Sequence, residues 1–316
     1  DGNDLVAFNG PADFQGITNP FAGKSYEWMS SIGAFNLSPG ISYKINEKIS
    51  VGATVNIFYG MMEMKRAVDA LNVAADPAAP IPGEDGFVDN QYEESGSGVG
   101  FGVSFGVLVR PINILSIGLS FKSKTNVVFE GEAKNTAFQA LNAYTSDYER
   151  DLTWPMWIGA GIAVTPTEKL ILTADVHFSQ WSATQEKLVT DYTHDVWAEN
   201  MNEEARTIPL NWDDKIQVRV GAQYQLTEKL AVRTGYYYDP APGPDETANI
   251  LLPSFTYNVF TLGSTYQFGQ LGLDFSFEYL AGTDRDVEPS SLANMPGSHG
   301  MNIIIFSLGA TYSFSQ

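Results

Sequence analysis

The 316-residue sequence has no cysteine, few charged residues and no long apolar run. Without cysteine it can form neither a disulfide scaffold nor a thiolate metal site. Its 18 basic and 37 acidic residues give a formal charge of -19, which excludes a protein whose main task is to neutralise nucleic-acid phosphates. No segment approaches the roughly 20 consecutive apolar residues of a membrane-spanning helix. Intrinsic disorder is also excluded, because aromatic residues make up 13% of the chain and charged residues only 17%.

Alternation of apolar and polar residues is the dominant pattern. Between residues 49 and 61 the odd positions carry Ile, Val, Ala, Tyr and Met, whereas the even positions carry mostly Ser, Gly, Thr and Asn. A period of two predicts a β-strand with one apolar face. About eleven such segments are predicted, at residues 31–45, 48–66, 97–110, 114–131, 153–165, 168–181, 213–227, 229–238, 255–268, 270–281 and 301–314. The sequence therefore predicts an all-β fold.

The connections between these segments alternate in length. Short turns lie at 46–47, 111–113, 165–167, 227–228 and 269–270. Long polar loops lie at 67–96, 132–152, 182–212, 239–254 and 282–300. Short turns at one rim and long loops at the other are typical of transmembrane antiparallel β-barrels, with the short turns on the periplasmic side. The mean hydropathy of -0.12 is consistent with such a barrel, because its apolar and polar faces cancel in the average.

A soluble β-sandwich is the alternative, but it does not explain the alternation of connection lengths along the whole chain. Aromatic residues at strand ends also favour the membrane barrel, since amphipathic rings concentrate at both membrane interfaces. These aromatic residues are Tyr43, Tyr59, Tyr224, Tyr236, Tyr238, Tyr266, Phe268, Tyr312 and Phe314. We expect a single outer-membrane barrel domain over residues 1–316.

The strand count has a further implication. Outer-membrane barrels normally have an even number of strands and both termini on the periplasmic side. Eleven is odd, and the first predicted strand ends at the short turn Asn46–Glu47. We therefore expect residues 1–30 to be an external loop and the sequence to lack a signal peptide and an odd number of preceding strands.

Several segments, taken in order, resemble one family. They are Asn36–Tyr59, Val99–Gly106, Trp154–Trp157, Val232–Tyr236 followed by Asp239–Pro242, and Phe306–Phe314. Together they resemble the FadL-like (OMPP1/FadL/TodX) outer-membrane transporters of long-chain fatty acids and other hydrophobic compounds. The resemblance implies fourteen strands and an N-terminal hatch in the complete protein, so the hatch and the first three strands would be absent here.

The resemblance also implies a function. We expect passive uptake of long-chain fatty acids through the outer membrane of a Gram-negative bacterium, without enzymatic activity, cofactor or metal. The expected partners are the hydrophobic ligand, outer-membrane lipid and lipopolysaccharide, with no nucleic acid, and the expected state is a monomer. Two alternatives stay open: uptake of aromatic hydrocarbons by the same mechanism, and a structural or secretion-complex role for a FadL-like barrel.

One strand is a candidate for ligand binding in the lumen. The inward positions of the segment 48–66 become apolar towards its outer end, at Phe58, Met62 and Met64, and then reach Arg66. An unpaired carboxylate in an apolar lumen is costly, so a nearby cation is required. In the family pattern Arg66 matches an arginine near the carboxylate of the bound fatty acid. A second family cation aligns with Ile208 here, and Arg206 is the nearest basic residue.

Two external loops are a candidate for first capture of the ligand. By the resemblance, a hydrophobic groove is expected between loops 67–96 and 132–152, with a short helix possible at 70–79 and at 133–144. Its candidate apolar residues are Val68, Leu71, Val73, Phe87, Phe138, Leu141 and Tyr144.

Other inward positions carry mixed charges, which usually pair across a barrel and stabilise its shape. They are Lys122, Lys124, Asp175, His177, Lys215, Arg219, Arg233, Asp274 and Glu278. Lys122 is also a candidate ligand contact. The Gly-x-Ser-x-Gly pattern around Ser104 is not a hydrolase motif, because the strand alternation continues through it to Arg110.

Overall fold

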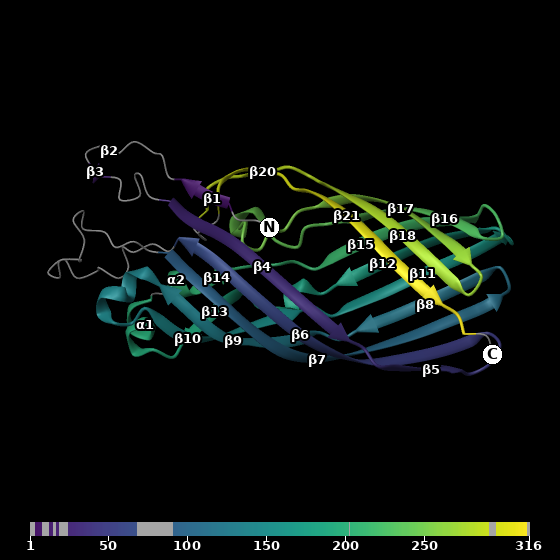
Figure 1. Cartoon of the computed structure of the whole chain (residues 1–316), viewed down its shortest axis with the longest axis horizontal. Helices are drawn as coiled ribbons and strands as arrows, with labels where there is room; N and C mark the ends of the chain where they lie inside the picture. Colours follow the sequence, from purple (N-terminus) through teal and green to yellow (C-terminus); the bar gives the residue numbers. More distant parts are fainter. Residues whose placement is uncertain are drawn as a thin grey trace.

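The computed structural model describes residues 4–7, 13–14, 17–18, 25–67, 91–201, 203–290 and 295–314. Its strands form one large antiparallel sheet that curves around a long axis, with the long loops at one end and the short turns at the other (Figure 1). No helix in the described part of the chain is long and apolar enough to cross a membrane.

The main strands of the large sheet are β4 (Ser25–Leu37), β5 (Gly40–Lys44), β6 (Ile49–Ala67), β7 (Gln91–Ile112), β8 (Leu115–Lys122), β9 (Thr125–Asn135), β10 (Thr145–Trp154), β11 (Trp157–Thr167), β12 (Leu170–Ser179), β13 (Lys187–Tyr192), β14 (Thr207–Pro209), β15 (Lys215–Gln225), β16 (Leu230–Asp239), β17 (Tyr257–Phe268), β18 (Leu271–Gly282) and β21 (Asn302–Tyr312). The short β1 (Asp4–Ala7) pairs with β4. Two small hairpins pair β2 (Asp13–Phe14) with β3 (Ile17–Thr18), and β19 (Arg285–Val287) with β20 (Gly297–His299).

Short interruptions divide five of the strands. The pairs β4/β5, β8/β9, β10/β11, β12/β13 and β14/β15 each continue one strand past a break, and β6, β7, β16, β17, β18 and β21 are continuous. Five broken and six continuous strands make eleven, as the sequence pattern predicted. Within the described residues β21 pairs with β18 alone and forms one edge of the sheet. On the other side, β4 pairs with β6 and, at Ser25–Trp28, with the short β1.

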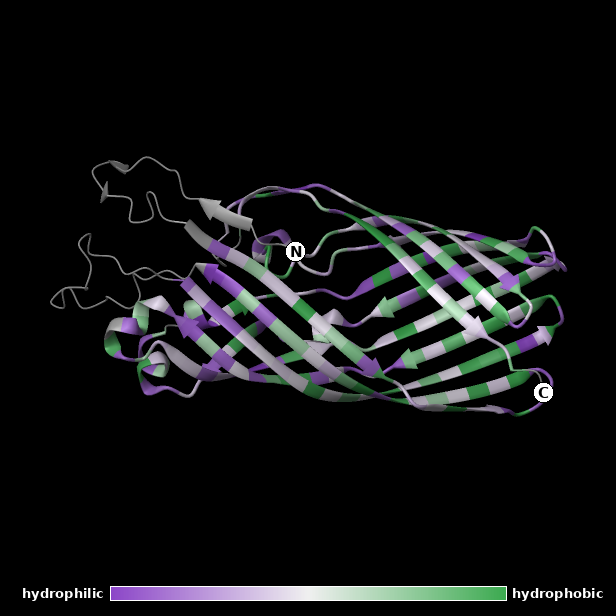
Figure 2. Cartoon of the chain, viewed as in Figure 1, coloured by the Kyte–Doolittle hydropathy of each residue, from purple (hydrophilic) through white to green (hydrophobic). Residues whose placement is uncertain are grey.

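The alternation of residue types places an apolar face on the outside. Figure 2 shows hydrophobic and hydrophilic residues alternating along the strands. Outward side chains such as Phe101, Leu119, Phe260 and Leu308 are more than half exposed, which suits contact with lipid rather than water. The predicted interfacial aromatic residues are exposed on this face as well, except for half-buried Tyr236, whose hydroxyl donates to Asn258.

The strand breaks divide the sheet into two tiers. The loop-side tier consists of β9, β10, β13 and β14 with residues 57–67 of β6 and 91–100 of β7. In β8 the even positions face inward, but in β9 the odd positions are buried, because residues 123–124 shift the alternation by one. The same shift separates β10 from β11 and β12 from β13. Lys124 is therefore exposed, and its predicted inward position was wrong.

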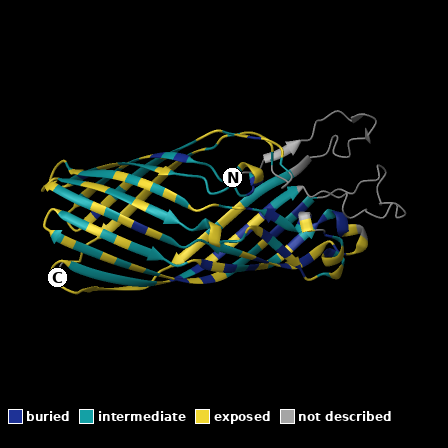
Figure 3. Ribbon diagram, turned by 180° about the vertical axis from the view of Figure 1, so that it is seen from behind, coloured by how far each residue is buried: buried dark blue, intermediate teal, exposed yellow. Residues whose placement is uncertain are grey.

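The interior is filled in the loop-side tier and more open elsewhere. Figure 3 shows buried residues gathered in the half that carries the helices and long loops. Outward positions of this tier carry carboxylates, including Glu130, Glu149 and Asp191. Since a charge on the lipid face is costly within the apolar band, this tier lies beyond that band, on the loop side.

Two predicted loops are largely ordered structure. Segment 132–152 contains the end of β9, the 3-10 helix η2 (Thr136–Leu141) and most of β10. Segment 182–212 contains β13, α1 (Asp195–Asn200), α2 (Glu203–Arg206) and β14. Two further 3-10 turns are η3 (Trp181–Ala183) and η4 (Asp245–Thr247). The first of the eleven predicted strands begins at Ser25 rather than at residue 31. The sequence pattern did not reveal these strands, because their outward positions carry polar residues. Their inward positions carry apolar side chains or polar side chains that pair with each other.

Candidate ligand-binding lumen

A packed apolar cluster, which we call the chamber, fills the inside of the loop-side tier. We define the chamber by its buried residues Phe58, Met62, Met64, Val127, Phe129, Leu188, Ile208 and Leu210, against which Leu152, Trp154, Trp212 and Leu252 pack. The even positions of β6 supply its first three residues, and β9, β13 and β14 supply most of the others. Aromatic rings line it closely, with the centroid of Trp154 6.3 Å from that of Phe58 and 6.4 Å from that of Phe129. Three of the residues predicted to line the lumen, Phe58, Met62 and Met64, thus lie together.

Lys122 lies at the turn-side end of the chamber. Its Nζ is 4.6 Å from the centroid of the Phe58 ring, a cation–π distance. Among the salt bridges of the described residues, none involves Lys122. Lys122 and Phe58, both candidate ligand contacts, are therefore brought together, and the chamber has a positive charge at this end.

Glycines on the inner face of β7 make room for the chamber wall. A Cβ atom at Gly98 would lie 2.7 Å from Cγ1 of Val127, and one at Gly96 would overlap the hydroxyl group of Tyr148. Such separations are sterically forbidden. The glycines at 96, 98, 100 and 102 therefore let neighbouring strands place large side chains across β7.

A buried ion pair closes the loop-side end of the chamber. Arg150 on β10 binds Glu94 on β7 through two hydrogen bonds, of which the one from Nη2 to Oε2 is 2.8 Å long. Their side chains are only 1% and 0% exposed. Arg150 Nε also donates to Oγ1 of Thr190 at 3.0 Å. Burial by itself disfavours the charge of Arg150, but the adjacent Glu94 carboxylate outweighs this effect and raises the pKa of Arg150.

The same ion pair contacts both the chamber and a cluster of tyrosines. Arg150 Nη1 lies 3.9 Å from the sulfur of Met62 and 3.7 Å from that of Met64. On its other side, the Tyr92 hydroxyl donates to Glu94 at 2.5 Å, and the Tyr192 hydroxyl donates to Tyr92 at 2.9 Å. The sequence reasoning missed both Glu94 and Arg150. For Glu94 the alternation of β7 offered a signal, since the even positions of this continuous strand face inward. For Arg150 the shift of the alternation between β10 and β11 had to be known as well.

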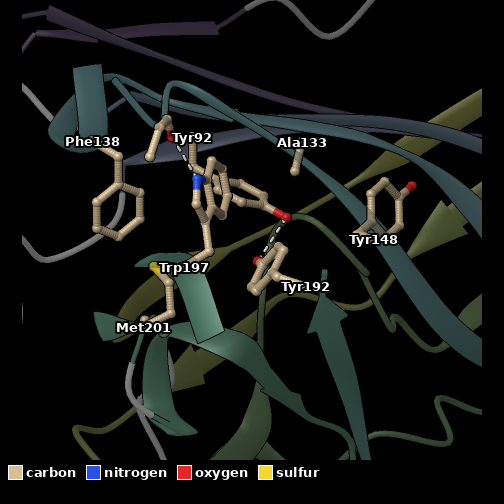
Figure 4. Packing of buried hydrophobic residues seen from close by; sticks show 9 residues of the cluster. Tyr92, Ala133, Phe138, Tyr148, Tyr192, Trp197 and Met201 are labelled. Carbon is tan, nitrogen blue, oxygen red and sulfur yellow. Dashed lines mark hydrogen bonds between the residues drawn. The ribbon is translucent and has the colours of Figure 1, made fainter. Parts of the chain in front are cut away.

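An aromatic cap covers the ion pair from the loop side. We define the cap as Tyr92, Ala133, Phe138, Ala143, Tyr148, Tyr192, Trp197, Met201 and Ala205. Figure 4 shows Trp197 of α1 between Phe138 and the tyrosines. The indole Nε1 of Trp197 donates to the carbonyl oxygen of Ala143 at 2.6 Å, and its ring centroid is 5.1 Å from that of Phe138. The cap therefore separates the chamber from the loop-side solvent.

Arg66 lies at the edge of this cap. Its guanidinium carbon is 5.2 Å from the centroid of the Tyr92 ring, and Nη2 donates to the Ala205 carbonyl oxygen at 2.6 Å. Arg66 is thus beside the cap, whereas Arg150 is the arginine that contacts Met62 and Met64. Arg206 points elsewhere: it donates to the Thr190 carbonyl oxygen and to outward-facing Asp191. Arg206 and Ile208 therefore place no cation in the chamber.

The structure separates the predicted groove residues. Phe138 is fully buried in the cap, whereas Leu141 and Tyr144 are 54% and 40% exposed. Val68, Leu71, Val73 and Phe87 lie outside the described residues, as does the predicted helix at 70–79. The 3-10 helix η2 occupies part of the second predicted helix, 133–144.

A cavity of about 570 Å³ adjoins the chamber on the turn side. Trp212 lines both spaces, and Trp157, His177, Lys215 and Arg219 are among the other residues of the cavity wall. Trp157 stacks on His177 with ring centroids 5.1 Å apart. Trp212 is therefore shared between the apolar chamber and this more polar cavity.

Most inward charges of the turn-side tier interact with each other. Asp175 contacts His177 at 3.1 Å and Arg219 at 4.0 Å, from the neighbouring strand. Arg233 lies 3.9 Å from Asp274. Tyr237 donates to Glu278, and the Arg219 guanidinium lies over the Tyr237 ring. These contacts join β12 to β15, β15 to β16 and, across β17, β16 to β18 on the inner face.

Ser104 lies in the middle of β7 and accepts a hydrogen bond from Asn56 Nδ2 at 2.7 Å. The strand is continuous through it, so the bend of a hydrolase nucleophile motif is not formed. In the part of the chain that the structure describes, no three His, Asp or Glu side chains are placed to hold a metal ion.

Comparison with known families agrees with this architecture. A family model described as outer membrane protein transport protein (OMPP1/FadL/TodX) matches residues 12–314. The chain belongs to this family. It is accordingly an outer-membrane transport protein rather than an enzyme, and its family transports hydrophobic small molecules.

Curated relatives are distant in sequence. Outer membrane protein P1 of Haemophilus influenzae is 24% identical over 324 residues, covering 93% of this chain and 67% of the relative. The long-chain fatty acid transport protein of Escherichia coli O6:H1 is 22% identical over 291 residues, covering 84% of this chain and 63% of the relative. The chain thus matches about two thirds of the length of these relatives.

Solved structures show the same fold. A FadL homologue of Pseudomonas aeruginosa superposes with a TM-score of 0.77 at 18% identity, covering 94% of this chain and 72% of that one. The toluene transporter TodX of Pseudomonas putida gives 0.64 at 17% identity, covering 84% and 68%. The all-β transmembrane barrel predicted from the sequence pattern is thereby confirmed.

Proposed function

We propose that this protein takes up long-chain fatty acids, or hydrophobic carboxylates of similar length, across the outer membrane without an energy source. The observation that carries the proposal is the charge distribution around the chamber. Lys122 lies at its turn-side end, Arg150 and Arg66 lie towards its loop-side end, and Glu94 is the carboxylate among them. An apolar cluster with surplus positive charge at its ends suits contact with a long apolar molecule that carries one carboxylate.

The chamber also favours a carboxylate over an aromatic hydrocarbon. A hydrocarbon gains from apolar contacts with Phe58, Phe129 and Trp154 but has no group that pairs with a cation. Placing three cations, one of them buried, near one carboxylate would then be a cost without a function. For a fatty acid, the same cations provide charge-assisted hydrogen bonds to the head group.

The proposed path follows the aromatic lining. A ligand captured among the external loops passes the cap, binds in the chamber, and continues past Trp212 into the turn-side cavity. Arg66 and Lys122 contact the carboxylate along this path, and Phe58, Met62 and Met64 contact the hydrocarbon chain. Each chain acts as one channel.

We also propose that the loop-side tier faces the polar layer of lipopolysaccharide. Glu149 stands opposite Glu130 on one neighbouring strand and opposite Asp191 on the other. Like charges directly opposite each other destabilise a sheet unless they are screened. Divalent cations that bridge lipopolysaccharide phosphates would provide this screening.

Uptake of labelled oleate tests the proposal. The full-length protein is reconstituted into liposomes or expressed in cells that lack their own transporter, and oleate, oleyl alcohol and toluene are compared. We expect oleate to enter faster than in controls without the protein. Toluene uptake without oleate uptake would favour the hydrocarbon alternative, and no uptake of any probe would favour a structural or secretion-complex role.

A further inference from the structure

The Glu94–Arg150 pair differs from the other ion pairs of the described residues. Its two side chains are 1% exposed or less, whereas each other salt bridge has at least one partner that is more than a quarter exposed. A pair removed from water in this way gains little stability over apolar side chains of similar size. Stability alone therefore gives a weak reason for two charges at the end of an apolar chamber.

The geometry of Arg150 is that of a carboxylate receptor. Its guanidinium holds the Glu94 carboxylate with two parallel hydrogen bonds, the arrangement by which arginine recognises carboxylates. Nη1 also faces the sulfur atoms of Met62 and Met64. A carboxylate bound in the same place would thus have its hydrocarbon chain against the chamber wall. Glu94 has the chemistry of a fatty-acid head group and occupies the head-group position.

We propose that Arg150 binds the carboxylate of the transported ligand. Until the ligand arrives, the Glu94 carboxylate is bound to the Arg150 guanidinium, and the ligand carboxylate then displaces it. This inference rests on the proposed function, because it requires a ligand with a carboxylate. It assigns the main head-group contact to Arg150 and leaves Arg66 as a second cation on the path.

The surroundings allow Glu94 to move away without leaving an uncompensated charge. After displacement it keeps the hydrogen bond from Tyr92, whose ring lies next to the Arg66 guanidinium. Arg66, Lys122 and Arg150 together carry three positive charges, so Glu94 and one bound carboxylate both still have a cation nearby. Thr190 continues to hold Nε of Arg150 and keeps the guanidinium in position.

Exchange at Arg150 also provides selectivity. An uncharged molecule cannot replace Glu94, because it offers no acceptor that matches the guanidinium. It binds in the chamber only beside the intact pair. Glu94 therefore lowers the affinity for carboxylates and leaves the affinity for uncharged molecules unchanged.

Binding of oleate and oleyl alcohol to the full-length protein in lipid nanodiscs tests this inference. We expect Glu94→Gln to raise the affinity for oleate about tenfold and to leave oleyl alcohol within about twofold, since one competing carboxylate is removed. Glu94→Asp, which keeps the charge but shortens the side chain, should raise oleate affinity by a smaller factor. Arg150→Lys should lower it. Glu149→Gln, on the outward face of the same strand as Arg150, is the matched control and should change neither.

The outcomes separate the two proposals. A gain in oleate affinity cannot result from general loss of structure, and Glu94→Asp keeps the test valid if Glu94→Gln does not fold. If oleate binds the unchanged protein but neither Glu94 variant alters the ratio of oleate to oleyl alcohol affinity, the exchange at Arg150 is refuted. If the unchanged protein binds neither probe, the proposed function itself fails.

Discussion

The hydroxyl group of Tyr148 on β10 occupies the space that a side chain at position 96 of β7 would need. Tyr148 reaches this position across β9, where its register partner Gly131 also lacks a side chain. A glycine on one strand thus determines how a tyrosine two strands away packs inside the barrel.

Replacing Gly96 should therefore destabilise the protein. We expect Gly96→Ala to cost about 1–3 kcal/mol, because the added methyl group forces Tyr148 out of its position. Gly118→Ala is the matched control: Gly118 is another inward glycine, with no atom within 4 Å of an added Cβ. Thermal unfolding in detergent measures both variants, and equal midpoints would show that Tyr148 adapts without cost.

Arg66 should affect binding of charged ligands selectively. Arg66→Ala removes a cation near the proposed carboxylate path, so we expect oleate affinity to fall about tenfold, in line with the 1.5–3 kcal/mol of a charge-assisted hydrogen bond. Binding of an uncharged hydrocarbon should change little. Lys65→Ala serves as control, because the side chain of Lys65 pairs with Glu27. A similar loss for both ligands would remove the proposed role of Arg66.

Trp197 should hold the cap together. Trp197→Ala removes a fully buried indole and its hydrogen bond to Ala143, and we expect a loss of about 3–5 kcal/mol. The Trp197 ring attaches α1 to the rest of the cap. Limited proteolysis should therefore cut the variant first near residues 195–200. Leu141→Ala, at an exposed position of the same region, is expected to resemble the unchanged protein.

Alkaline pH should weaken the loop-side tier. Burial, and next the Glu94 carboxylate, raise the pKa of Tyr192. Below pH 10 Tyr192 is protonated in both states. Above about pH 10 the unfolded chain loses this proton and the folded protein keeps it, so stability falls by up to about 1.4 kcal/mol per pH unit. Denaturation midpoints between pH 8 and pH 11 should therefore decline more steeply than for Tyr192→Phe. Parallel declines would show that Tyr192 does not contribute.

The chamber residues show which part of the candidate site could be predicted from the sequence. Phe58, Met62 and Met64 were predicted together because they share one parity on one strand, and period-two alternation within a strand is a local property. Lys122 also followed from parity and lies against Phe58. Arg206 did not join them, because α2 directs its side chain towards Asp191.

The amino-acid sequence by itself determined the all-β class, the eleven strands, the outward apolar face and the short turns, since these depend on alternation and turn residues that are adjacent in the chain. Only the tertiary structure decided which charges meet inside. Arg150 and Glu94 are 56 residues apart, and their contact depends on the register of β7, β9 and β10 and on the breaks that shift the alternation by one residue. A shift of one residue reverses every side chain beyond it, so parity alone could not place Arg150 in the lumen.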